Sequence, residues 1–282
     1  MDYLERNRGP GPTQLAHPEL ATGVGRRFLG RSPLWLVPAG LLVFMLVAWE
    51  VSVLAGVVDP LLFPPPSRII ESAGELTVNG VLPGHVLATV LRVAVAVAVG
   101  AGLGVVLGVA MGVSHRLRAV LDPIAGALHP VPKIAILPLI MVVFGIGDVS
   151  LVIVIATGAF FPMLINTMAG VHQIHPTYLD LATIHGVSGL RRMKRVIIPA
   201  AGPSMMAGLR LSLNTALLIT VAVEMIAART GLGSMIWLSW STLRTEHIYV
   251  AIAVTIAFGL AVNGVLSWLT RRTLPWFHGR LR

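Results

Sequence analysis

Long apolar segments separated by short polar ones make up most of the chain after residue 33. The first, 34–56, is 23 residues of almost unbroken apolar character. As a helix it is about 35 Å long, enough to cross a bilayer core of about 30 Å. The pattern therefore predicts an all-α integral membrane protein with about six transmembrane helices. The predicted spans are 34–56, 86–113, 121–147, 151–171, 205–228 and 248–269.

Two of these spans carry residues that predict how they pack. In 86–113, Gly104, Gly108 and Gly112 are four residues apart and lie on one helical face, a pattern that lets a second helix approach closely. The span 121–147 contains four prolines, so we expect a broken or kinked helix there. The predicted transmembrane domain is 34–270, and the stretch 57–84 is expected to be a loop.

The composition agrees with a membrane chain and excludes several classes of site. Hydrophobic residues make up 55% and charged residues 12%, against about 25% charged in ordinary soluble domains. The chain has no cysteine, which excludes disulfides, thiolate metal sites and cysteine catalysis. A net charge of +9 would suggest a nucleic-acid partner in a soluble protein. Here it more simply reports Lys and Arg on the cytoplasmic side, and no nucleic acid is expected.

The distribution of Lys and Arg predicts the orientation of the spans. With the N-terminus inside, 15 of the 21 fall in cytoplasmic segments and three in external loops. This asymmetry predicts that both ends are cytoplasmic. The segment 1–33 is then a cytoplasmic tail, expected to be disordered, and 271–282 is a basic cytoplasmic tail. The polar loop 175–199 is also placed in the cytoplasm.

That loop is polar and cationic between two apolar spans. Residues 177–185 can form two helical turns, and Gly186 lies where a left-handed residue would end them. Ser188 can cap a second short helix that carries four cations. Leu181 and Ile184 are three apart, so they share a face that could bind in a groove of a partner. The alternative is an ordinary basic loop held near the membrane by anionic lipid.

The spacing in this loop resembles the cytoplasmic "EAA" loop of ABC-importer permeases. Asp180 stands for the Glu of that motif, Leu181 and Ala182 for its two alanines, Gly186 for its glycine and Pro199 for its closing proline. Asp and Leu are departures from the pattern, and they suggest a slightly remodelled groove in the partner ATPase. Further matches cover roughly residues 60–240 in order, among them the runs 64–68, 121–123, 129–139, 144–147, 160–171, 222–225 and 231–233. Together they resemble the permeases for aliphatic sulfonates, taurine, nitrate and bicarbonate.

The resemblance implies the inner-membrane permease of a bacterial type I importer. Such a transporter contains a permease homodimer in membrane lipid, two ATP-binding-cassette ATPase subunits and an extracytoplasmic substrate-binding protein. ATP and Mg would bind the ATPase. No phosphate-loop motif occurs in this chain, so we expect that it is not an enzyme and holds no cofactor. The expected substrate is a small anion, an aliphatic sulfonate or taurine, with nitrate, bicarbonate or a vitamin precursor as alternatives.

Three ionisable residues within the spans are candidates for the substrate pathway or its gate: Lys133, Glu224 and Arg92. Glu224 could equally serve helix packing, and Arg92 could reach the membrane interface. The alternative for Lys133 is a structural pair with Glu224. The candidate coupling residues are Asp180, Leu181, Ala182, Ile184, Gly186 and Pro199.

Two other classes of membrane protein fit the sequence less well than a permease. An intramembrane enzyme would need a catalytic motif, and neither His-Glu-x2-His nor Gly-x-Ser-x-Gly occurs. An ion-gradient-driven secondary transporter also suits broken helices and charges at the midplane, but it has no use for the cationic loop. His172, His175 and His185 flank that loop without a suitable set of further ligands, so no metal site is expected.

Overall fold

The structure, a computed structural model, describes residues 36–274, and every regular element in that range is a helix. The chain divides into two compact units, 1–48 and 49–282. The described part of the first unit is the beginning of α1 (Leu36–Leu54), an apolar helix with exposed side chains. The predicted tail 1–33 and residues 275–282 lie outside the described residues.

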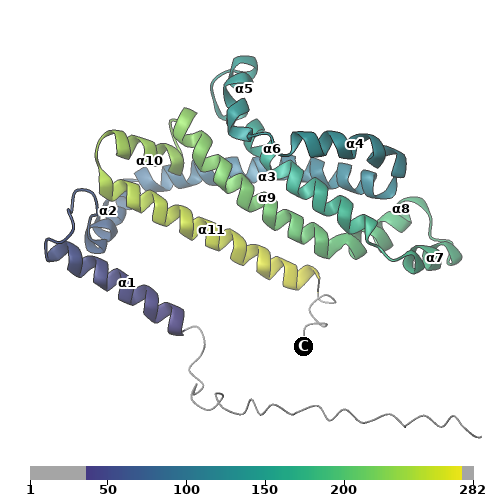
Figure 1. The fold of residues 1–282 in the computed structure, drawn as a ribbon, viewed down its shortest axis with the longest axis horizontal. Coiled ribbons are helices and arrows are strands. Elements are labelled where there is room, and N and C mark those ends of the chain that lie inside the picture. The colour runs from purple at the N-terminus through teal and green to yellow at the C-terminus, as the bar shows by residue number, and fades with distance from the viewer. Residues whose placement is uncertain (1–35, 275–282) are drawn as a thin grey trace, which may run out of the picture. The chain divides into compact units, whose positions relative to one another are not determined.

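Three long helices form the centre of the second unit: α3 (Val81–Val113), α6 (Asp148–His172) and α9 (Ile198–Ala227). The helix α6 packs against both α3 and α9, and α11 (Thr245–Thr273) runs beside α9 (Figure 1). Fully buried apolar side chains such as Val154, Ile155 and Val223 fill the space between them. The prediction of an all-helical membrane fold is confirmed: five helices are long and apolar enough to span a membrane, or six with the bent pair described below.

The glycine face of α3 packs directly against α6. A Cβ atom at Gly104 would lie 2.8 Å from the carbonyl oxygen of Phe160, and one at Gly108 would lie 2.7 Å from the Cβ of Thr167. One turn earlier, a Cβ at Gly100 would collide with the carbonyl group of Ala156. The predicted role of the glycines in close helix packing is therefore confirmed, and the face extends one turn further than the sequence pattern suggested.

We expect Gly100→Leu to reduce the amount of folded subunit strongly, because the added side chain would have to separate α3 from the backbone of α6. Gly102 is the matched control: it lies on the same helix, and a Cβ there meets nothing within 4 Å. The two leucine variants can be compared by thermal stability and yield in detergent. Equal stability would show that close packing of α3 on α6 is not required.

The expected broken span is present. It consists of α4 (His115–Leu128), a short 3-10 turn η1 (Lys133–Ile136) and α5 (Leu137–Phe144). The two apolar parts meet at an angle of 88°, and Pro130 and Pro132 lie at the break. The far part, α5, projects from the group formed by α3, α6 and α9 (Figure 1).

Two helices occur where the sequence analysis expected loops. The first is α2 (Pro66–Val78), which corrects the loop expected over 57–84, and the second is α10 (Leu232–Ser241), between two predicted spans. The buried residues Leu76 of α2 and Leu232 of α10 belong to one apolar cluster, which also includes residues of α11. Both helices are too short to span a bilayer, so a search for spans passes over them.

The boundaries of several spans also differ from the prediction. Whereas the fifth span was expected at 205, the helix runs from 189 through α8 (Gly189–Arg192), the π-helical turn η2 (Met193–Ile197) and α9. Pro199 lies in the first turn of α9, as expected, directly after the π-helical turn η2. At the other end, α11 continues to Thr273, so Arg271 and Arg272 belong to its last turn rather than to a tail.

Candidate functional site

The loop between α6 and α9 contains the predicted short helix, α7 (Pro176–Ile184). It ends as predicted at Gly186, whose φ of +68° is left-handed. The N–H of Gly186 donates to the oxygen of Thr183 (3.0 Å), and the N–H of Val187 donates to the oxygen of Ala182 (2.8 Å). These two bonds form a Schellman motif, which satisfies carbonyls at the end of the helix. The turn therefore fixes where the chain leaves α7.

One face of α7 presents apolar side chains to the surroundings. Leu181 is 49% exposed and Ile184 is 76% exposed, and Tyr178, one turn earlier on the same face, is exposed as well. Ala182, the residue after Leu181, is buried. Asp180 is exposed and forms no ion pair among residues 36–274. The loop thus offers an apolar stripe with a carboxylate beside it, and Tyr178 is a member that the sequence analysis missed.

Ser188 occupies the N-cap position of α8, but its side chain makes no capping hydrogen bond. The predicted cap is therefore correct in position only. The cap of α7 is instead made by His175, whose Nδ1 accepts from the N–H of Thr177 (3.3 Å). The four cations expected on the second helix lie on α8 and on the π-helical turn η2, directly before α9.

A second cluster lies inside the spans and is built on three polar side chains of α3. His85, Thr89 and Arg92 occupy positions i, i+4 and i+7, so they share one helical face. This face meets the end of α9 and the connection from α9 to α10. The N–H of Gly231 donates to His85 Nδ1 (3.0 Å), and the N–H of Leu232 donates to the hydroxyl oxygen of Thr89 (2.8 Å).

Arg92 lies at the centre of this cluster and forms its ion pairs. It is only 6% exposed, and each of the five N–H donors of a guanidinium group has a matching acceptor. Nη1 donates to Glu224 Oε1 (2.7 Å) and to the carbonyl oxygen of Thr230 (2.5 Å). Nε and Nη2 both donate to Asp148 Oδ1, and Nη2 also donates to the hydroxyl of Thr230. Arg92 therefore ties together α3, the first residue of α6, the end of α9 and the turn that follows it.

Glu224 is fully buried, and several donors satisfy its carboxylate. Besides Arg92, the hydroxyl of Thr89 (2.9 Å) and the N–H of Gly233 (3.0 Å) donate to Oε2. Gly231 has a φ of +123°, and a Cβ on it would collide with the Glu224 carboxylate. The Gly231-Leu232-Gly233 turn thus folds directly onto the carboxylate, and only glycine leaves room for this contact at residue 231.

Asp148 differs from Glu224 because its side chain is 72% exposed. Together with Arg92 and Thr230 it lines a pocket of about 380 Å³ whose other walls are mainly apolar. One guanidinium therefore faces two carboxylates, one in the protein core and one open to the pocket.

Lys133 lies apart from this network. Its ammonium group donates to the carbonyl oxygens of Leu128, His129 and Val131, and it lies 4.8 Å from the centre of the Phe161 ring. A lysine has three N–H donors, so these bonds use all of them. The alternative of a Lys133–Glu224 pair is therefore wrong, because Glu224 pairs with Arg92.

Residues 100–275, well over half of the chain, match the family described as "Binding-protein-dependent transport system inner membrane component". The chain belongs to this family. It is thus the permease subunit of an ABC importer, as the loop motif predicted, and the ion-gradient alternative falls away. Multiple apolar helices agree with a multi-pass protein of the bacterial inner membrane.

The permease is similar to three curated relatives over most of its length. The taurine transport system permease protein TauC of Escherichia coli K12 is 33% identical over 86% of this chain and 90% of its own. SsuC of Bacillus subtilis 168, a permease protein named for aliphatic sulfonates transport, is 32% identical over 89% and 90%. The riboflavin transport system permease protein RibX of Chloroflexus aurantiacus is 33% identical over 83% and 88%.

A solved structure shares the fold. A chain of the MetNI methionine ABC transporter, in inward-facing conformations, aligns with a TM-score of 0.62 over 68% of this chain and 95% of its own. At 16% identity, this likeness supports the helical permease fold and no finer property.

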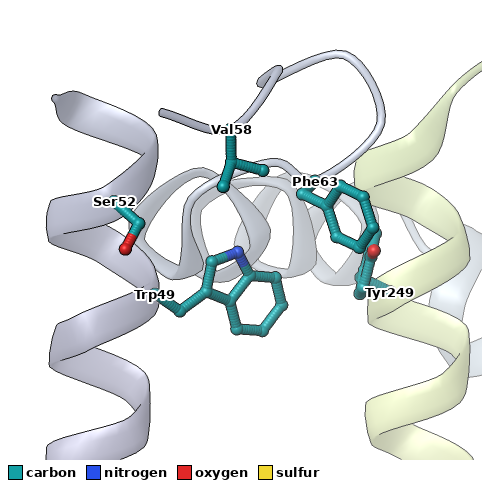
Figure 2. Close-up of a pocket in the computed structure, with 5 residues that line it drawn as sticks. All are labelled: Trp49, Ser52, Val58, Phe63 and Tyr249. Carbon is teal, nitrogen blue, oxygen red and sulfur yellow. The ribbon is translucent and has the colours of Figure 1, made fainter. Parts of the chain in front are cut away.

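The permease has a further pocket, apolar and of about 490 Å³, lined by Trp49, Ser52, Val58, Phe63 and Tyr249 (Figure 2). The Trp49 and Tyr249 rings are 5.4 Å apart, and the Tyr249 hydroxyl donates to the carbonyl oxygen of Leu62 (3.3 Å). Amphipathic rings at the ends of two spans are typical of a membrane interface. With no charged lining residue, this pocket offers nothing to hold an ion.

Within residues 36–274, no group of three or more His, Asp or Glu side chains is arranged to hold a metal ion. His172 and His185 are exposed, and His175 is used in the cap of α7. The histidines around the loop are thus accounted for by local structure and solvent.

Proposed function

We propose that this permease forms the translocation pathway for a small anion, an aliphatic sulfonate or taurine. The observation that carries the proposal is the similarity, over more than four fifths of the chain, to TauC and to SsuC, whose names refer to these substrates. Cationic side chains within the spans agree with an anionic substrate, since charged groups there usually mark a pathway or a structural pair.

The loop 175–199 is proposed to couple the pore to a separate ATPase. The exposed stripe of Leu181, Ile184 and Tyr178 has the spacing of a helix that binds in a groove. The Schellman turn at Gly186 joins this stripe firmly to α8, and from there the helix continues through η2 into α9. A displacement of α7 would therefore reach the pore through a nearly continuous helix, with Pro199 in its first apolar turn.

The proposed assembly is the one that the family implies. Two copies of the permease, surrounded by lipid, would bind two ATPase subunits on the cytoplasmic side and a substrate-binding protein outside. ATP and Mg would be held by the ATPase subunits and not by this chain. The excess of Lys and Arg in the predicted inner segments supports cytoplasmic N- and C-termini. Exposed apolar side chains on α5, such as Val142 and Val143, suit a second permease or lipid.

Arg92 and Glu224 are proposed to form the ion pair on which a gate at the outer end of the spans depends. Their charges cancel within the core, and their bonds cross three helices and one turn. Such a network has a defined geometry that a change of state would have to break. Lys133, which is bonded to three carbonyls where α4 and α5 meet, is proposed to hold the bend of the broken span beside the pathway.

A vitamin is the second candidate substrate, because the identity to RibX, 33%, equals the identity to TauC, over a slightly smaller share of the chain. Nitrate and bicarbonate are further candidates from the same branch. Substrate choice in this proposal depends mainly on the binding protein that delivers the ligand to the permease.

Deleting the gene in its host should abolish growth on taurine or an alkanesulfonate as the sole sulfur source and leave growth on sulfate unchanged. Uptake of labelled taurine should return with the gene, and should require both the ATPase and the binding protein. Normal sulfonate uptake in the deletion strain, or a defect confined to riboflavin, nitrate or bicarbonate, would contradict the proposed substrate.

A further inference from the structure

Four polar side chains meet between α9 and α11, well inside the two apolar helices. Arg210 Nη2 donates to the hydroxyl oxygen of Ser267 (3.0 Å), and Asn263 Nδ2 donates to Asn214 Oδ1 (3.0 Å). Each helix contributes a pair of residues four positions apart, so the contacts follow one another along the same line. Arg210 is 12 residues, about 18 Å, from the start of α9.

Arg210 differs from the other cations in the spans because it has no negative partner. Both ion pairs among residues 36–274 belong to Arg92. The carboxylate of α9, Glu224, is 14 residues further on, about 21 Å along the helix. Ser267 is neutral, and its own hydroxyl donates to the carbonyl oxygen of Asn263. The positive charge of Arg210 is therefore not neutralised within the described part of the chain.

The hydrogen-bonding capacity of Arg210 is also largely unused. A guanidinium has five N–H donors, and the described contacts of Arg210 use one of them. By contrast, the donors of Arg92 and Lys133 are all taken up by carboxylates, hydroxyls or carbonyls. Asn214 accepts through its oxygen, which leaves its amide N–H₂ group as a further donor. On the α9 side of this cluster, the unused groups are therefore N–H donors.

Arg210 and Asn214 are exposed, on a face of α9 that also carries the exposed Leu211 and Leu218. A cation that faces hydrocarbon within a span is costly, so such residues usually face a bundle interior or a water-filled cavity. This cost favours an orientation of the face toward the interior of the assembled transporter rather than toward lipid.

Building on the anionic substrate proposed above, we propose that Arg210 and Asn214 form a binding site for the sulfonate group along the translocation pathway. Sulfonate oxygens accept hydrogen bonds and carry a negative charge, which matches a guanidinium and an amide with unused donors. With cytoplasmic termini, Ser267 lies one turn above Arg271 and Arg272, so the site belongs to the inner half of the membrane. The substrate would reach this site after it has passed the outer gate at Arg92.

The absence of cysteine allows a direct test of the charge at this site. In the assembled transporter, Asn214→Cys introduces a single permease thiol one turn from Arg210. Its reactions with sulfonatoethyl methanethiosulfonate, which carries an ethanesulfonate group, and with the trimethylammonium analogue are compared. We expect the anionic reagent to be favoured, and the ratio of rates to fall roughly tenfold when Arg210→Met is added, since the attraction of one reagent and the repulsion of the other are lost.

Leu218→Cys is the matched control. It lies on the same exposed face but two turns from Arg210, about 12 Å away, where screening removes most of the effect. The ratio at Leu218→Cys should therefore barely respond to Arg210→Met. A ratio at Asn214→Cys that is equally insensitive to Arg210→Met would overturn the site, even in a transporter that carries sulfonates.

Uptake separates this inference from the proposed substrate. Arg210→Met should raise the apparent KM for taurine at least tenfold with normal amounts of subunit, and Arg210→Lys should restore part of the loss. If Arg210→Met lowers the amount of subunit, the uptake kinetics of Arg210→Lys and the ratio of thiol reaction rates test the binding site instead. An unmodified transporter that takes up no sulfonate would contradict the proposed function, and the thiol ratio would still report whether the site attracts anions.

Discussion

Replacing Glu224 by alanine is expected to lower the free energy of unfolding of the permease by about 3–5 kcal/mol. The carboxylate is fully buried, and its removal leaves a guanidinium, a hydroxyl and a backbone N–H without their acceptor. The Gly231-Leu232-Gly233 turn would also lose the group onto which it folds. The loss should appear as a lower melting temperature in detergent and a smaller yield of folded subunit.

Asp148→Asn is the matched control, because Asp148 pairs with the same guanidinium but is mostly exposed. Its removal should cost about 1 kcal/mol or less, as for other exposed pairs. Removing both buried charges, with Arg92→Met and Glu224→Met together, should recover part of the stability lost in Arg92→Met alone. If Glu224→Ala and Asp148→Asn had equal effects, the buried Arg92–Glu224 pair would be no more important for stability than the exposed Arg92–Asp148 pair.

Much of the fold follows from length and hydropathy. Stretches of 20 or more apolar residues have few alternatives to a membrane helix, and the glycine face of α3 directly predicts a close neighbour. By contrast, α2 was missed although Ile69, Ala73 and Leu76 have helical spacing, because proline and charge around them suggested a loop. Helix ends were also displaced, because polar residues such as Arg271 and Arg272 continue a helix beyond its apolar stretch.

The site was predicted unevenly for a similar reason. The end of α7 depends on a local pattern, and glycine at a left-handed position can be recognised from neighbouring residues. The partners of Arg92 are 56 and 132 residues away in the chain, so no local pattern identifies them. One signal was available: His85, Thr89 and Arg92 are polar, at positions i, i+4 and i+7 of an otherwise apolar helix. Arg210 gave no signal beyond its charge.

Gly186→Val is expected to reduce substrate uptake about tenfold or more while the subunit still reaches the membrane. A β-branched residue at a φ of +68° costs roughly 1–2 kcal/mol or more, so the turn would change to relieve the strain. That change would break the two Schellman bonds and redirect α7, whose exposed stripe is proposed to bind the ATPase. Uptake, membrane content of the subunit, and ATPase activity with and without the binding protein would be measured together.

Gly186→Asn provides the matched control, because asparagine adopts left-handed backbone conformations far more readily than valine. A Cβ at this position meets nothing within 4 Å, so either side chain has space and the two variants differ mainly in backbone preference. Asparagine should therefore retain most of the uptake, and the ATPase should still respond to the binding protein. Valine should uncouple ATP hydrolysis from transport, leaving ATPase activity that no longer depends on the binding protein. If valine and asparagine both transport normally, the turn at Gly186 does not fix α7 for coupling, and the contact with the ATPase must depend on other residues of the loop.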